Sequence, residues 1–246
     1  MRRPAGYSII LLLLLLLVPG GCGGGGNTGS SLFFVSEPFA FEVPEGSSTD
    51  LTVLGMNGII EINGSAAVST VFISGVMKVG HANSAEAMLH ITDVDVMVSE
   101  AGGEVMVETD QPSPAPTGIN YIVEYSITLP ETMVISASQA NGEITIQGMN
   151  SDITASQANG TIDVEAVMPP GGSFDLSIAN GAITLTIPTD TSADLMCVSA
   201  TGRVWAYNLT ILNPVQGTHS LSGTLDGGDG EINITTANGD ITVQGI

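Results

Sequence analysis

A short pattern that recurs through the C-terminal half of this 246-residue chain most limits how it can fold. Its common form is a small residue, any residue, Ala-Asn-Gly, any residue, Ile, any residue and an aliphatic residue. Four clear copies, one degenerate copy and one earlier echo are, in that order, Ser138–Ile146, Ser156–Val164, Ser177–Leu185, Thr235–Val243, Ser199–Ala206 and Leu54–Ile62. Recurrence of whole flanks at a nearly constant spacing is typical of proteins whose repeats stack on one another.

The Asn-Gly pair predicts a corner in each copy, because Gly adopts the positive φ that a sharp change of direction needs. Aliphatic residues then alternate with Thr or Asp, as in a strand with one buried face. A repeat of about 20 residues, at about 3.3 Å per residue, would make one three-sided coil. The corner residues of the clear copies would be structural; they are Asn141, Gly142, Asn159, Gly160, Asn180, Gly181, Asn238 and Gly239.

Stacked coils would place Asn141, Asn159 and Asn180 above one another, so that their amides bond along the stack. Thr201, in the degenerate copy, would interrupt that ladder. The sequence therefore predicts an all-β fold, a right-handed single-stranded β-solenoid (β-helix-like) with short strands. Asn-Gly is also the strongest two-residue hairpin signal, so a β-sandwich of antiparallel hairpins is the alternative.

No stretch from Leu32 onward sustains helical periodicity with a cap at each end, so we expect no helix. A proline-rich loop, Asp110–Gly118, separates an irregular part, 32–118, from the regular repeats, 119–246. Both parts are expected to belong to one domain, residues 32–246.

Residues 1–21 have the features of an export signal. Arg2 and Arg3 precede an unbroken apolar run, Ile9–Val18. Ten residues match the apolar region of a signal peptide and are too few to span a bilayer as a helix. The sequence therefore predicts export from the cytoplasm.

Small residues precede Cys22, and this arrangement resembles a bacterial lipobox, in which the signal is cut before the Cys and that Cys is lipidated. An ordinary secretory signal cut near Gly20 or Gly21 is the alternative. Residues 22–31 would be the lipidated Cys and a flexible Gly/Ser-rich tether. No Asp follows Cys22, which points to the outer membrane if the organism is Gram-negative.

The charge balance excludes a nucleic-acid-binding protein. Lys plus Arg total 4 against 25 Asp plus Glu, a formal net charge of −21, whereas a phosphate backbone needs a Lys/Arg footprint. The apolar fraction of 43% is too high for a disordered acidic chain. Two cysteines exclude a disulfide-stapled miniprotein and a multi-cysteine zinc module, and Cys197 is expected to be a small core residue.

Candidate catalytic groups are few. Lyases that cut acidic polysaccharides need basic residues to hold the substrate, and only Lys78 and Arg203 follow the signal. A hydrolase could use a carboxylate pair, although a solvated face would show the same outward acids. The carboxylates near the corners are Glu143, Asp163, Asp175 and Asp240. We expect no enzymatic activity and no cofactor.

Two further segments could bind ligands. The acidic turn Asp226–Glu231 has oxygens that could hold Ca²⁺, but it does not match an EF-hand loop, and no metal site is predicted. Arg203, Trp205 and Tyr207 fall on alternate positions and so share one side of a strand. Facing outward, they would form an aromatic and cationic patch suited to a sugar ring; facing inward, they would fill a wider coil.

The stretch Val123–Met149, VEYSITLPETMVISASQANGEITIQGM, is followed by further Asn-Gly-x-Ile copies and resembles the bacterial family labelled "putative adhesin". The similarity covers roughly Val53–Ile246 and is best in Val123–Ile187. Members are secreted or membrane-attached proteins with an aliphatic strand ending in Pro, then Asn-Gly-x-Ile/Val repeats. The resemblance implies a β-helix-like domain on the cell envelope and carries no catalytic motif.

The sequence as a whole predicts a non-enzymatic cell-envelope lipoprotein that displays an adhesin-like β-solenoid, residues 32–246, for surface binding or structural display. The alternative is a carbohydrate-binding or carbohydrate-active β-helix protein. Expected partners are the membrane, through the lipid anchor, and a glycan or surface-protein ligand.

Overall fold

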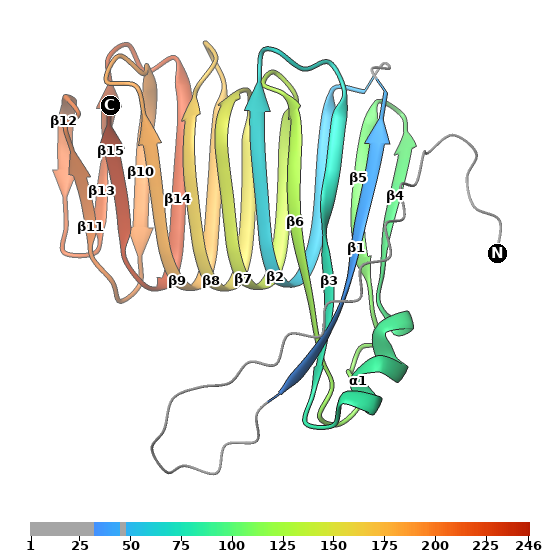
Figure 1. The fold of residues 1–246 in the computed structure, drawn as a ribbon. Helices are drawn as coiled ribbons and strands as arrows, with labels where there is room; N and C mark the ends of the chain where they lie inside the picture. The colour runs from blue at the N-terminus through green and yellow to red at the C-terminus, as the bar shows by residue number, and fades with distance from the viewer. Residues whose placement is uncertain (1–31, 45–47) are drawn as a thin grey trace.

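The computed structural model describes residues 32–44 and 48–246, which form an all-β protein with one short α-helix (Figure 1). A 15-stranded sheet runs from β1 at one end to β12 at the other and does not close on itself. The predicted all-β class is confirmed. An open sheet of this kind is also compatible with the sandwich alternative.

Four long strands form the centre of the sheet, and each carries one copy of the repeat. They are β2 (Asp50–Ser65), β7 (Val134–Asn150), β8 (Ile153–Val167) and β9 (Ser173–Ile187). Each strand pairs in parallel with the next, and the Asn-Gly pairs of neighbouring copies lie side by side. The Asn-Gly pairs are therefore corners within long strands and not hairpin turns.

Each central copy is one bent strand with two limbs, which differs from the expected three-sided coil of short strands. The first limb precedes the Asn-Gly corner and the second follows it. All corners lie along the same edge, which runs the length of the stack (Figure 1). The connections that return along the opposite edge are short, residues 151–152 and 168–172. Two limbs and one return use all residues of a repeat, so none remain for a third side.

The core lies between the two limbs because alternate side chains of each limb point inward. In β7, Ile135 and Ala137 of the first limb and Ile144 and Ile146 of the second are at most 1% exposed. The same positions are buried in β8 and β9, and the buried residues form one cluster along the stack. Burying each such aliphatic side chain contributes about 1.5–3 kcal/mol, so every added copy extends the same core.

Neighbouring corners approach too closely for any residue but glycine. Gly142, Gly160 and Gly181 have φ of 131°, 135° and 144°. A Cβ on Gly160 would lie 1.8 Å from the carbonyl oxygen of Gly142, and one on Gly181 would lie 1.7 Å from that of Gly160. Both the backbone conformation and the available space therefore require Gly at each corner.

At one end of the stack the copies do not follow chain order. The last copy forms β14 (Gly230–Asn238) and β15 (Ile241–Gly245). These strands lie between β9 on one side and β10 (Ala193–Ser199) with β11 (Val204–Tyr207) on the other, parallel to both. A later segment of the chain is thus inserted between two earlier ones.

The opposite end of the stack shows a similar insertion. Strand β2 pairs with β7 on one side. On its other side, its first limb pairs with β5 (Glu104–Asp110) and its second limb with β6 (Asn120–Pro130), and all these pairings are parallel. The proline-rich loop joins β5 to β6. The N-terminal part, expected to be irregular, therefore contributes a complete copy to the stack.

Antiparallel strands cover most of the outer edges. The strand β13 pairs with β10, and β12 pairs with β13; β4 pairs with β5, β3 with β6, and β1 with β3. Their bounds are Ser220–Leu225 for β13, Ile211–Gln216 for β12, Asp95–Ala101 for β4, Val71–His81 for β3 and Phe33–Val43 for β1. β11 pairs only with β15 and remains an edge strand.

The expectation of no helix was wrong. Helix α1 spans Ser84–His90, and a single 3₁₀ turn, Ile91–Asp93, follows it. The side chain of Asn83 caps the helix by accepting from the backbone N–H of Ala85. Seven residues are too few for the i, i+3, i+4, i+7 periodicity to be recognised in the sequence, so the cap was the only signal.

Candidate functional site

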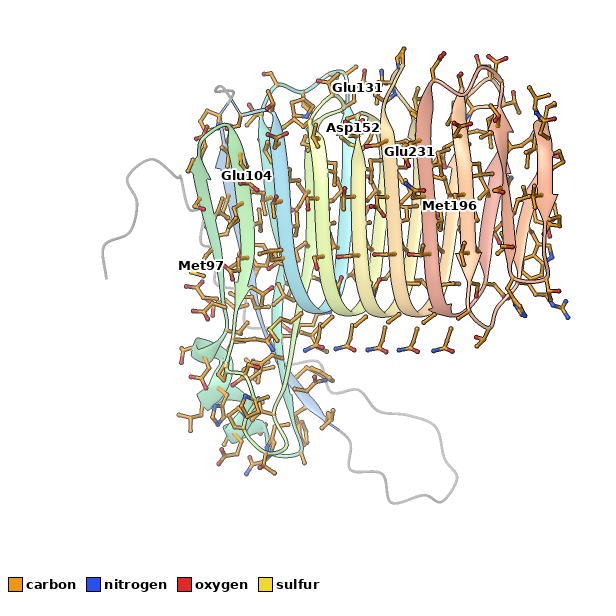
Figure 2. The ribbon with its side chains drawn as sticks, turned by 180° about the vertical axis from the view of Figure 1, so that it is seen from behind. Met97, Glu104, Glu131, Asp152, Met196 and Glu231 are labelled. Atoms are coloured by element: carbon orange, nitrogen blue, oxygen red, sulfur yellow. The ribbon has the colours of Figure 1, made fainter. Side chains whose placement is uncertain are left out.

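The corner asparagines form a hydrogen-bonded row that runs along the corner edge of the stack. Figure 2 shows the row of side chains at this edge. Each Nδ2 donates to the Oδ1 of the preceding member, at 2.7 to 3.0 Å. In order along the stack the members are Asn57, Asn141, Asn159, Asn180 and Asn238. Asn57 in turn donates to the carbonyl oxygen of Tyr121. Every amide in the row both donates and accepts.

The degenerate copy lies at the end of the row, so the expected interruption by Thr201 was wrong. Oγ1 of Thr201 donates to Oδ1 of Asn238, at 3.2 Å. The reason is the insertion of β14 and β15, which brings Asn238 next to Asn180 and leaves Thr201 outside. The row therefore runs unbroken through five copies and ends in a hydroxyl group.

Two buried glutamines, which the sequence patterns did not reveal, hydrogen-bond to backbone carbonyl groups on the inner side of the corners. Nε2 of Gln139 donates to the carbonyl oxygens of Gly58 and Asn141. Gln157 makes the same pair of bonds one copy further on. The Oε1 atoms of both side chains are buried without a hydrogen-bond partner among the described residues. A Gln at the same position of two successive copies was the signal that could have identified them.

The four carboxylates considered for a hydrolase do not converge. Glu143 and Asp163 lie on the outer face of the second limbs, whereas Asp175 lies on a first limb. Oδ1 of Asp240 accepts a hydrogen bond from the backbone N–H of Arg203 at a corner. These four carboxylates therefore form no pair of the kind that a hydrolase uses.

Partial burial raises the pKa of Asp163, and the negative charges of Glu143 and Glu165 raise it further. Like charges on a half-desolvated face disfavour the ionised form. This is the behaviour of a crowded acidic surface, and the aspartate has no acid or base partner of the kind that catalysis needs.

The acidic turn, Asp226–Glu231, hydrogen-bonds to neighbouring parts of the fold. Oδ2 of Asp229 accepts from Oγ of Ser192 at 3.2 Å, so part of its binding capacity is used within the fold. Asp194, Asp229 and Glu231 border a shallow hollow, but no group of three or more His, Cys, Asp or Glu residues that could hold a metal occurs in residues 32–44 and 48–246.

The histidines and the described cysteine have structural surroundings. His90 lies at the end of α1, where its Nδ1 is 2.6 Å from Oδ2 of Asp93. Cys197 is fully buried, and burial raises the pKa of its thiol to about 12. Its thiol is therefore neither ionised nor accessible at neutral pH. Cys22 lies outside the described residues.

Arg203, Trp205 and Tyr207 lie at the end of the stack, at or on edge strand β11. They alternate with Val204, which is 3% exposed and faces the core. Trp205 is half-buried beside Thr242, while Arg203 and Tyr207 are exposed, Tyr207 by 51%. Trp205 and Tyr207 therefore lie on the side of β11 opposite the buried Val204, and Arg203 immediately precedes the strand.

Comparison with known proteins gives a likeness in fold. A crystal structure from Clostridium sporogenes ATCC 15579, described as a "putative cell adhesion protein", has 15% identity and a TM-score of 0.60, covering 86% of this chain and 100% of that chain. A "putative adhesin" from Bacteroides fragilis NCTC 9343 has 9% identity and a TM-score of 0.30, covering 85% and 97%. The first similarity supports the same fold for both proteins.

A scan against protein-family models and a search of the curated proteins gave no match. Within residues 32–44 and 48–246, no helix has the length and apolar character needed to cross a membrane.

The amide row predicts an asymmetry between two exposed positions of one corner. Asn159→Ala should lower the free energy of unfolding by about 1 kcal/mol, because it removes the bonds to Asn141 and Asn180. Thr161→Ala, an exposed residue two positions later, should change it by less than about 0.5 kcal/mol. Urea unfolding of both variants measures the difference. Equal midpoints would contradict a stabilising role of the row.

Asp163→Asn should increase stability at neutral pH. The folded state raises the pKa of this carboxyl above its usual 3.8, so its ionised form destabilises the fold above the folded-state pKa. That cost disappears as the pH falls through the folded-state pKa and below 3.8, where wild type and variant should unfold alike. Urea midpoints across this range measure the effect, and Asp175→Asn on the opposite face is the control. A gain that persists in acid would contradict this cause.

Proposed function

We propose that this chain is an exported, lipid-anchored, non-enzymatic protein that displays an adhesin-like β-solenoid at the cell envelope. The observation that carries the proposal is the unbroken row of parallel, in-register copies, which presents two outer faces on either side of one continuous core. Repeat stacks of this kind serve as extended binding or display surfaces. The likeness in fold to the Clostridium sporogenes structure described as a "putative cell adhesion protein" supports the same role.

The solenoid interpretation is supported by the pairing of whole copies. From β5 and β6 through β2, β7, β8 and β9 to β14 and β15 and then β10 and β11, each layer is parallel to the next. Parallel strands joined through crossover connections are right-handed in nearly all proteins, so we propose a right-handed coil.

The anchor rests on the sequence around Cys22, which has the small residues of a lipobox before it and a Gly/Ser-rich tether after it. A tether of this composition keeps a folded domain close to the membrane without fixing its orientation. In a Gram-negative organism we propose the outer membrane as its location.

Carbohydrate binding is the second candidate function. The observation that favours it is the outward patch of Arg203, Trp205 and Tyr207. An aromatic ring stacks on the apolar face of a sugar, and a neighbouring cation donates to its hydroxyl or acidic groups. The chain's 25 acidic residues against 4 basic ones make Arg203 an unusual cation in this setting.

Cys22→Ala tests the anchor. The variant should lose acyl labelling and appear in the soluble fraction of cells that hold the wild-type protein in membranes, because the thiol is the attachment point. Cys197→Ala is the control, since that thiol is buried. Acyl labelling retained by the Cys22 variant would contradict the lipoprotein assignment.

Thermal unfolding with a panel of envelope and host glycans tests the second candidate. A ligand that binds only the folded state raises the melting temperature with its concentration. At least one glycan should do so with the wild type and fail with Trp205→Ala, while Tyr121→Phe, a substitution at a buried residue far along the stack, keeps the response. Absence of any shift would contradict carbohydrate binding and leave display as the function.

A further inference from the structure

The inserted strands β14 and β15 (residues 230–245) occupy a slot formed entirely by earlier parts of the chain. On one side they pair with β9, and on the other with β10 and β11. Their covalent link to these neighbours is the four-residue turn 226–229, which follows β13. Beyond this turn, the described residues of the segment are held by non-covalent contacts.

The slot is built to hold a strand of one pattern. Ile232, Ile234, Ile241 and Val243 are 0% exposed and fill the space between the limbs. Without them, two sheet edges and the core beside them would be uncovered, which is the arrangement that pairs with another strand. The slot is therefore a strong strand-binding site that its own chain normally fills.

The corner between β14 and β15 further restricts which strand the slot can bind. A Cβ on Gly239 would lie 1.8 Å from the carbonyl oxygen of Gly181, so only glycine is accepted there. Asn238 before it joins the amide row through Asn180 and Thr201. The slot thus selects an Asn-Gly corner flanked by aliphatic alternation, which a second copy of this chain carries in the same segment.

The connecting turn crosses the end of β10, since β13 pairs with one side of β10 and β14 with the other. It contains Asp226 at φ 46° and Gly228 at φ 74°. Asp226 is a non-glycine residue in the left-handed region, where backbone strain is stored. Oγ of Ser192 holds the closed turn by accepting from the N–H groups of Gly227 and Asp229. Opening the turn would release the strain and lose these bonds.

We propose that this slot exchanges its occupant, so that residues 230–245 of one copy bind between β9 and β10–β11 of a second copy. The strand contacts are identical in the closed and exchanged forms, so only the turn and the cost of association differ. Short strained connections favour such exchange. The net charge of −21 opposes the approach of two copies, and salt screens that repulsion, so exchange should increase with ionic strength.

Single cysteines at neighbouring positions detect the exchange directly. Asp175 on β9 lies opposite Asn233 on β14 in the parallel register. Asp175→Cys and Asn233→Cys are made in separate chains, both carrying Cys22→Ser, then mixed at high protein concentration, warmed below the melting temperature and oxidised. The exchange brings β14 of one copy beside β9 of the other and therefore favours a disulfide between the two chains over the yield from chance collision.

Met196→Cys replaces Asn233→Cys in the matched control. Met196 is exposed on the same outer face, on β10, a strand that does not move in the exchange (Figure 2). The Asp175–Asn233 mixture should give severalfold more linked dimer than the control, and Ser192→Ala in both chains should increase it further. Equal yields from both mixtures, or no linked dimer even with Ser192→Ala, would overturn the proposal.

Discussion

The close approach of successive corners determines the rest of the structure. Each corner glycine lies against the carbonyl oxygen of the previous one, at a separation that admits no Cβ. This contact fixes the register of every limb, because slipping a strand by one residue would bring a side chain to the corner and turn the buried face outward. The aliphatic core, the amide row and the two polar faces all follow from that register.

Local patterning in the sequence was enough to predict the elements but not their arrangement. The alternation around Ile144 and Ile162 predicts which side chains are buried, and Asn-Gly predicts the corners. The order of the last two copies could not be predicted, since Ser199–Ala206 and Thr235–Val243 both fit the pattern and local residues do not state which neighbour each copy meets. The short helix α1 was not predicted for another reason: seven residues are too few to show a helical periodicity in the sequence.

The candidate site was predictable to a similar degree. Spacing alone places Arg203, Trp205 and Tyr207 on one side of a strand, but only the burial of Val204 determines which side. Glu143 and Asp163 come from successive copies and meet on one face, while Asp175 lies before its corner and therefore belongs to the other. The bend therefore separates Asp175 from Glu143 and Asp163, although all three lie near corners in the linear pattern.

The amide row also has a direction. Every Nδ2 points toward the β2 end and every Oδ1 toward the β11 end, so the amide dipoles add head to tail and polarise one another. At one end the backbone carbonyl of Tyr121 accepts the last proton, and at the other the hydroxyl of Thr201 supplies one. Each of these two groups completes the hydrogen bonding of the last amide in the row and presents no side-chain amide to a further layer. The replacement of Asn by Thr thus ends the run of head-to-tail amide dipoles at the degenerate copy.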